Sequence, residues 1–204
     1  MTNIYLVRHG EASEGWTSKD PPLSQQGQLQ ARSIIPFLKT IFRKEFNVIS
    51  SPLKRCIETA SICMQEFDVN ISIEEKFREL PSPISNLDDR VNWLKRILPL
   101  TWSELEEDEV TLNSHINFNH WRQQIINEVL TFKVNTIVFT HYVVINTIIG
   151  DILKTDKIVN FHPSNCSITE ITLTNNELKI INLGENFETK VNSVSYTHLT
   201  LPTT

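Results

Sequence analysis

The chain has 204 residues, enough for one domain whose core needs no metal, and its 3 cysteines without a CxxC pair argue against a disulfide framework or a zinc site. Its formal net charge of -5 at pH 7 does not suggest a broad nucleic-acid-binding surface. The N-terminus lacks the pattern of a signal peptide, and no apolar run reaches the ~18 residues of a membrane span, so we expect a cytoplasmic protein without a membrane partner.

Strand and helix patterns alternate through the first half of the chain. Ile4 to Val7 form a short apolar run that predicts a buried strand. Ser24 is typical of a helix N-cap, and the apolar spacing after it predicts a helix over residues 25–43, kinked at Pro36. A second strand, a second helix and a third strand are then predicted at residues 48–49, 53–67 and 69–73.

The second half begins with an irregular segment and then returns to alternation. Residues 80–118 lack a clear period, and we interpret them as an insertion that folds over one end of a sheet. Helices are predicted at residues 119–132 and 142–153, around a strand at 136–140. Two further strands, at 166–173 and 178–183, flank Asn175-Asn176 and predict a hairpin.

This order of elements predicts an α/β fold. Strands that alternate with helices favour three layers, α/β/α, around a mostly parallel central sheet, with an antiparallel edge strand supplied by the hairpin. We assign residues 1–184 to one domain. Residues 185–204 are predicted to form an irregular tail, and translated non-native sequence is an alternative interpretation of residues 193–204.

Cationic side chains follow three of the predicted strands. Arg8 and His9 end the first strand, Arg55 comes just after the second, and His141 directly follows the strand at 136–140. Because ligands of open α/β sheets bind outside the carboxyl ends of the strands, we expect these side chains to meet at one edge. Two arginines and two histidines together suit a doubly charged oxyanion such as a phosphate.

His9 is the candidate nucleophile of this cluster, because histidine is an accepted covalent catalyst. Arg8, Arg55 and His141 can neutralise the oxygens of a phosphoryl group during its transfer. The sequence therefore favours phosphoryl-transfer chemistry on a small phosphorylated substrate.

The cluster also needs an acid for the leaving oxygen, which a carboxyl group with a raised pKa can supply. Glu79 is a candidate because it lies where the chain leaves the third strand, and Glu11 and Glu58 compete with it. His115 and His120 are five residues apart, which does not place them on one helical face, so a metal pair is not expected.

Five segments, in this order, carry a resemblance to a known family. They are Leu6-Val7-Arg8-His9-Gly10-Glu11, residues 20–31, residues 50–60, Phe77-Arg78-Glu79-Leu80 and Val138-Phe139-Thr140-His141, and residues 165–168 add a sixth. Over about residues 3–184 the chain resembles the histidine phosphatase superfamily, the phosphoglycerate mutase-like clan.

The resemblance implies a phosphoglycerate mutase-like fold and a mechanism that needs no metal and no cofactor. It implies that His9 becomes a phosphohistidine, that Arg8, Arg55 and His141 hold the phosphoryl oxygens, and that Glu79, in preference to Glu11, protonates the leaving group. It further implies a phosphatase that hydrolyses phosphomonoesters, whose substrate the insertion at residues 80–118 selects.

Two departures from the family pattern bear on this expectation. Tyr142 stands where the family usually has glycine, which predicts a tighter or more aromatic pocket. Leu80-Pro81-Ser82-Pro83 follows Glu79 where true mutases resemble one another in a longer Glu-Arg-His-Tyr-Gly segment, which favours a phosphatase over a mutase. A mutase and a non-catalytic phospho-ligand-binding protein remain the alternatives, and the sequence leaves the oligomeric state open.

Overall fold

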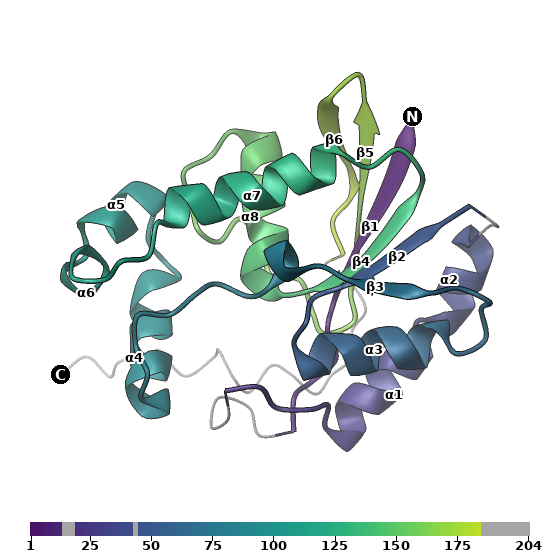
Figure 1. The fold of residues 1–204 in the computed structure, drawn as a ribbon, viewed down its shortest axis with the longest axis horizontal. Helices are drawn as coiled ribbons and strands as arrows, with labels where there is room; N and C mark the ends of the chain where they lie inside the picture. Colours follow the sequence, from purple (N-terminus) through teal and green to yellow (C-terminus); the bar gives the residue numbers. More distant parts are fainter. Residues whose placement is uncertain (14–18, 43–44, 185–204) are drawn as a thin grey trace, which may run out of the picture.

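The computed structural model describes residues 1–13, 19–42 and 45–184, and builds them around a six-stranded sheet (Figure 1). The predicted tail at residues 185–204 lies outside the described residues. Each strand matches a predicted one to within a few residues. The strands are β1 (Thr2–Arg8), β2 (Asn47–Ser50), β3 (Ile71–Ile73), β4 (Thr136–Thr140), β5 (Ile168–Thr174) and β6 (Glu177–Asn182).

The sheet is mostly parallel, as predicted. Its strand order is β3-β2-β4-β1-β5-β6, and β1 to β4 run parallel to their neighbours within this set. β5 lies antiparallel to β1, and β6 antiparallel to β5, so the hairpin forms the edge. Asn175 and Asn176, with φ of 53° and 62°, make its turn, because a two-residue hairpin loop of type I′ needs positive φ at both positions.

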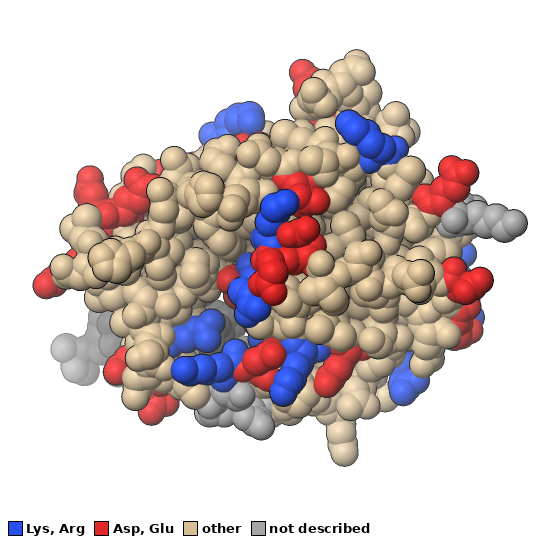
Figure 2. Space-filling model, viewed as in Figure 1, with Lys and Arg blue, Asp and Glu red and all other residues tan. Residues whose placement is uncertain are grey.

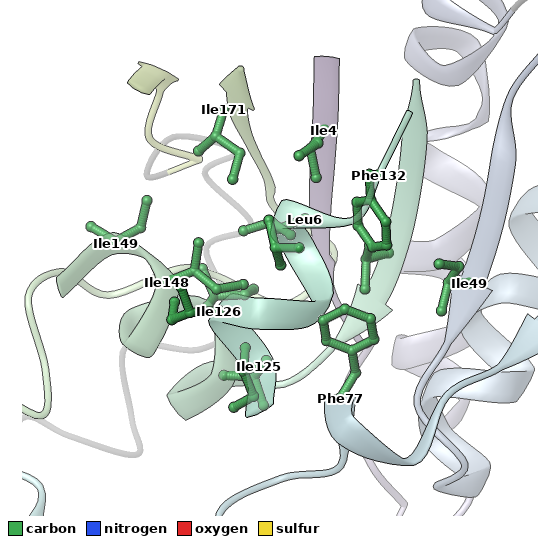
Figure 3. Packing of buried hydrophobic residues seen from close by; sticks show 14 of the residues in the cluster. Ile4, Leu6, Ile49, Phe77, Ile125, Ile126, Phe132, Ile148, Ile149 and Ile171 are labelled. Carbon is green, nitrogen blue, oxygen red and sulfur yellow. The ribbon is translucent and has the colours of Figure 1, made fainter. Parts of the chain in front are cut away.

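Helices cover both faces of the sheet and complete the predicted three layers (Figure 1). Alternation along β1 divides its side chains, so that Ile4 and Leu6 enter one buried cluster and Tyr5 and Val7 enter the other. Figure 3 shows the first cluster, where isoleucines of α7 (Phe118–Leu130) and α8 (Tyr142–Leu153) pack on the sheet. Each such side chain contributes about 1.5–3 kcal/mol on burial.

The opposite face is covered by α1 (Gln25–Ser33), α2 (Ile35–Ile41) and α3 (Lys54–Met64). Ser24 caps α1 as predicted, and its hydroxyl oxygen accepts from the backbone N–H of Gly27. The prediction of one kinked helix over 25–43 was wrong, because the helix breaks at Ile34 and Pro36 stands in the first turn of α2. A proline is tolerated there since that turn has no partner for its N–H.

The prediction of an irregular segment at residues 80–118 was also wrong. After the short 3-10 helix η1 (Glu75–Phe77), the chain forms α4 (Leu87–Ile97), α5 (Trp102–Glu107) and α6 (Glu109–Leu112). A side-chain cap begins each of these short helices: Asn86 caps α4, Thr101 caps α5 and Asp108 caps α6. The three helices lie to one side of the sheet, with their own buried cluster (Figure 1).

Two general properties of the chain follow from the described residues. All three cysteines are free and buried, and Cys63 and Cys166 pack as small apolar side chains in one cluster. Within the described ranges, no helix combines the length and the apolar character that crossing a membrane requires.

Candidate active site

The register of the parallel strands brings the predicted cationic residues together. Arg8 of β1 pairs with Thr140 of β4, and the backbone N–H of His9 donates to the Thr140 carbonyl at 3.0 Å. His141 is the next residue after Thr140, and its ring lies 5.2 Å from the His9 ring, centroid to centroid. The expectation that these strand ends meet at one edge is therefore confirmed.

His9 is buried, and its two ring nitrogens have different hydrogen-bond roles. Its Nδ1 lies 2.7 Å from the carbonyl oxygen of Gly10, which can only accept, so Nδ1 carries the hydrogen. The lone pair is then on Nε2, which accepts from Nε of Arg55 at 3.2 Å. Burial, followed by the charges of Arg55 and Arg8, lowers the pKa of His9 well below its ordinary value. A neutral imidazole is the form required of a nucleophile, and its Nε2 lone pair becomes available when the hydrogen bond from Arg55 is displaced.

Arg55 joins the two histidines. It projects from the first turn of α3, and its Nη2 lies 3.2 Å from Nδ1 of His141. Since a guanidinium only donates, Nδ1 of His141 accepts, and its Nε2 donates to the hydroxyl of Ser51 at 2.7 Å. Burial, followed by the charges of Arg55 and His9, lowers the pKa of His141 well below its ordinary value. Arg55 therefore lies in contact with both histidine rings. A phosphoryl group bound at this point would contact the same two rings.

Arg8, the residue before His9, is held by two contacts. Its Nη1 donates to the Pro163 carbonyl at 2.8 Å, and its Cζ lies 5.2 Å from the centroid of the Tyr142 ring. The Tyr142 hydroxyl is in turn 2.5 Å from Nδ1 of His162. Tyr142, the residue after His141, therefore packs its ring on the guanidinium of Arg8, and the tighter or more aromatic pocket stays a prediction.

Glu79 lies next to this cluster, after η1. Its Oε1 accepts from the backbone N–H of Leu80 at 3.0 Å. Burial raises the pKa of the Glu79 carboxyl, and that hydrogen bond and the charges of Arg55 and Arg8 only partly oppose the rise. A carboxyl group with a raised pKa beside an oxyanion site has the property of a proton donor.

The two competing carboxylates hold the loop after β1. Glu11 accepts from the Ser24 hydroxyl at 2.7 Å, and Glu58 accepts from the backbone N–H of Leu23 at 2.7 Å. The backbone here is tightly packed, since a Cβ on Gly27 would lie 2.1 Å from the Glu11 carbonyl oxygen. Both glutamates are therefore already engaged in holding this loop.

Several polar residues of the site were not singled out from the sequence. Thr59 accepts from the backbone N–H of Gly10 at 3.0 Å and donates to the Arg55 carbonyl at 2.6 Å, so it ties the His9 loop to α3. Asn165 donates to the His9 carbonyl at 3.0 Å. Asp20 lies 4.0 Å from Nη1 of Arg55. These positions fall inside the motif segments, but only the folded chain shows what they contact.

His115 and His120 are exposed. Across the part of the chain that the structure describes, no group of 3 or more His, Cys, Asp or Glu side chains is placed to hold a metal ion.

The chain is similar to known proteins in both sequence and fold. The curated relatives include proteins named probable phosphoglycerate mutase, at 30% identity over 112 residues in Photorhabdus laumondii and 29% over 134 residues in Cronobacter sakazakii. These matches cover 48% and 62% of this chain and 50% and 51% of the relatives, so the chain spans about half the length of the curated relatives it matches.

Solved structures with the same fold cover nearly the whole chain. A phosphoserine phosphatase of Entamoeba histolytica, in complex with 3-phosphoglyceric acid, has a TM-score of 0.71 at 20% identity and covers 92% of this chain and 98% of its own. A phosphoglycerate mutase of Bacillus anthracis has a TM-score of 0.69 at 20% identity, with coverages of 90% and 93%. The pattern of the histidine phosphatase superfamily (branch 1) matches residues 4–186, and the chain belongs to this superfamily.

Proposed function

We propose that this chain is a phosphatase that hydrolyses small phosphomonoesters through a phosphohistidine on His9, without a metal ion. One observation carries the proposal: Nε2 of the neutral His9 ring faces Arg55, which also reaches His141. A phosphoryl group that displaces Arg55 slightly would meet the nucleophile on one side and the guanidinium donors of Arg55 and Arg8 on the others.

The first step of the proposed reaction moves the phosphoryl group to the enzyme. Nε2 of His9 forms a bond to phosphorus while the bond from phosphorus to the leaving oxygen breaks. Glu79 gives its proton to that oxygen, and the alcohol departs. Arg8 and Arg55 donate to the equatorial oxygens, over which the charge is spread in the transition state, and His141 donates as well once its Nδ1 has taken up a proton in the presence of the dianion.

The second step returns the enzyme to its starting form. Glu79, now a carboxylate, accepts a proton from a water molecule whose oxygen attacks phosphorus. The bond from phosphorus to Nε2 of His9 breaks, and inorganic phosphate leaves. Each step makes one bond to phosphorus and breaks one, and Glu79 ends protonated as it began.

A mutase is the second candidate, because the curated relatives carry that name. In a mutase the phosphohistidine would return its phosphoryl group to another substrate oxygen, which requires that water is kept out of the site. The segment after Glu79 favours the phosphatase, since it departs from the longer motif that mutases share.

A panel of phosphate esters tests the proposal, with an aryl phosphate, sugar phosphates and phosphoproteins offered in the presence of EDTA. We expect phosphate release that survives EDTA and is lost in His9→Ala, while the exposed His115→Ala retains it. Loss of activity with EDTA contradicts the metal-free mechanism. Isomerised ester with little free phosphate identifies a mutase, and ester binding that needs Arg8 and Arg55 without any turnover identifies a phospho-ligand-binding protein.

A further inference from the structure

Thr140 is the last residue of β4 and directly precedes His141. It is fully buried. Its backbone carbonyl accepts from the N–H of His9 at 3.0 Å, and the thiol of Cys56 donates to the same oxygen at 3.5 Å. The backbone of Thr140 therefore contacts both the loop of the candidate nucleophile and the helix that carries Arg55.

The side chain of Thr140 reaches the segment that carries Glu79. Its Oγ1 donates to the backbone carbonyl of Phe77 at 3.0 Å, and Phe77 precedes Glu79 by two residues. The Phe77 ring is itself fully buried, in one cluster with Ile125 and Phe132 (Figure 3). The hydroxyl of Thr140 thus ties the Glu79 segment to the end of β4 from inside the protein.

A second contact joins the same two segments further along the chain. The backbone of Val143, the second residue of α8, forms a hydrogen bond with the Glu79 carboxyl group. Residues 77–79 and residues 140–143 are therefore connected at both ends, and His141 lies between the two connections. Together these contacts set where the Glu79 carboxyl group lies relative to the histidines.

The outer side of η1 is held by ion pairs at the surface. Lys76 pairs with Glu128 of α7, and Arg78 pairs with Glu75. Figure 2 shows charged side chains of both signs gathered over this part of the face, where the short helix after β3 lies in Figure 1. Ion pairs in contact with water contribute little and are screened by salt, whereas a hydrogen bond in the dry interior is stronger. The bond from Thr140 is therefore the firmer constraint on this segment.

We propose that Thr140 is a positioning residue for proton transfer by Glu79. Its hydroxyl keeps the Glu79 carboxyl group within reach of the leaving oxygen, and Thr140 itself neither gains nor loses a proton. The inference rests on the proposed function, because it takes Glu79 as the donor and His9 as the nucleophile. A donor must lie at hydrogen-bond distance from the oxygen that it protonates, and a displacement of about 1 Å can lower a rate by about 10²-fold. Without the hydroxyl, the buried Phe77 carbonyl loses this donor, so we expect the segment to shift.

Two esters with similar leaving groups test the proposal. 4-Nitrobenzyl phosphate releases an alcohol that needs a proton, whereas 4-nitrophenyl phosphate, one methylene shorter, releases a phenolate that does not. Their kcat/KM values report the first step of the reaction, and the ratio of the two values does not depend on the fraction of enzyme that is folded.

The variants separate the hydroxyl from the bulk of the side chain. Thr140→Val keeps the shape and removes the hydroxyl, and Thr140→Ser keeps the hydroxyl. Thr136→Val is the matched control, because Thr136 is also fully buried, lies at the other end of β4, and donates its hydroxyl to the Val134 carbonyl at 2.9 Å. Chemical denaturation measures the stability of each variant.

We expect Thr140→Val to lower kcat/KM for 4-nitrobenzyl phosphate by about 10- to 100-fold, and for 4-nitrophenyl phosphate by less than about threefold. Thr140→Ser should restore the wild-type ratio, and Thr136→Val should retain it although its stability falls. In Glu79→Gln, which already lacks the donor, the addition of Thr140→Val should not change the ratio further, because the two residues act as one unit.

An equal change on both esters in Thr140→Val, or a further change of the ratio when it is added to Glu79→Gln, overturns the inference and leaves the proposed function intact. A wild-type ratio in Glu79→Gln removes Glu79 as the donor, and no hydrolysis of either ester removes the proposed function. Both of these results overturn the inference as well. If Thr140→Val does not fold, the same ratio is measured in Thr140→Ala, and the same outcomes decide.

Discussion

The edge of the sheet and the α4–α6 segment are built in different ways. At the sheet edge, His9 and His141 are held by backbone register and by hydrogen bonds to Gly10, Arg55 and Ser51. In the α4–α6 segment, short capped helices pack on an apolar cluster of their own. The first region has little freedom to change without losing its chemistry. The second can vary its exposed and pocket-facing residues while its core persists, which suits a region that selects substrates.

The largest loss of activity should come from a change of Glu79, the candidate proton donor at the sheet edge. Glu79→Gln keeps the size of the side chain and removes its proton, so we expect kcat to fall by about 10²- to 10⁴-fold for alkyl phosphates. The rate of the first step should fall less with 4-nitrophenyl phosphate, because its leaving group needs no proton. Steady-state and burst kinetics on the two ester types measure this, and an equal loss on both would argue for a structural role.

A change in the second region should affect stability rather than chemistry. Asp108 is buried, caps α6 by accepting from the Thr111 backbone N–H, and pairs with Arg96. Asp108→Ala should lower the free energy of unfolding by about 1–3 kcal/mol and leave kcat within about threefold of the wild type. Chemical denaturation measures the free energy of unfolding, and steady-state kinetics measure kcat. Asp108→Asn, which can still cap the helix, should lose less, and an equal loss in both variants would assign the effect to the charge alone.

Acid should destabilise the sheet edge in particular. The folded state favours neutral His9 and His141, whose pKa values lie well below the ordinary value. This stabilisation is complete above the unfolded pKa of ~6.5 and is lost as the pH falls through the lowered folded values. The free energy of unfolding should therefore decline from pH 7 to pH 5, and decline less in His141→Gln.

The exposed His115→Gln serves as the control for this decline and should retain the wild-type slope. Glu79 acts with the opposite sign, because a raised carboxyl pKa favours the protonated form and its stabilisation is lost as the pH rises. The measurements of unfolding free energy against pH are therefore repeated in Glu79→Gln, which removes the contribution of Glu79. If the slope of the unfolding free energy against pH were the same in His141→Gln as in the wild type, the assignment of His141 as buried and neutral would be contradicted.

The smallest effect is expected where the two regions meet. Tyr142 packs on Arg8 and also against the α4–α6 cluster. Tyr142→Leu removes the ring and should raise KM by about two- to tenfold, whereas Tyr142→Phe keeps the ring and should change KM less. A larger effect of Tyr142→Phe on kcat than on KM would instead point to the hydrogen bond with His162.

The residues at the sheet edge could be predicted from the sequence because each of them follows directly after a predicted strand. Arg8 and His9 follow an apolar run directly, and His141 follows another, so the rule for parallel sheets brings them together. The partners of these residues were less accessible, since Ser51, Thr59 and Asn165 act through contacts that only folding creates. The α4–α6 helices were missed because the segment begins with Pro81 and Pro83 and because α5 and α6 have only 6 and 4 residues, too few to show a helical period.

Trapping the phosphoenzyme tests the central claim most directly. The protein is mixed with a ³²P-labelled phosphomonoester, quenched in alkali, where phosphohistidine survives, and the labelled peptide is located by mass spectrometry. We predict an acid-labile phosphoryl group on His9 that forms within one turnover, is absent in His9→Ala, and is replaced by labelled inorganic phosphate when unlabelled ester is added. Hydrolysis of the ester with no label on His9 at any time would contradict the account.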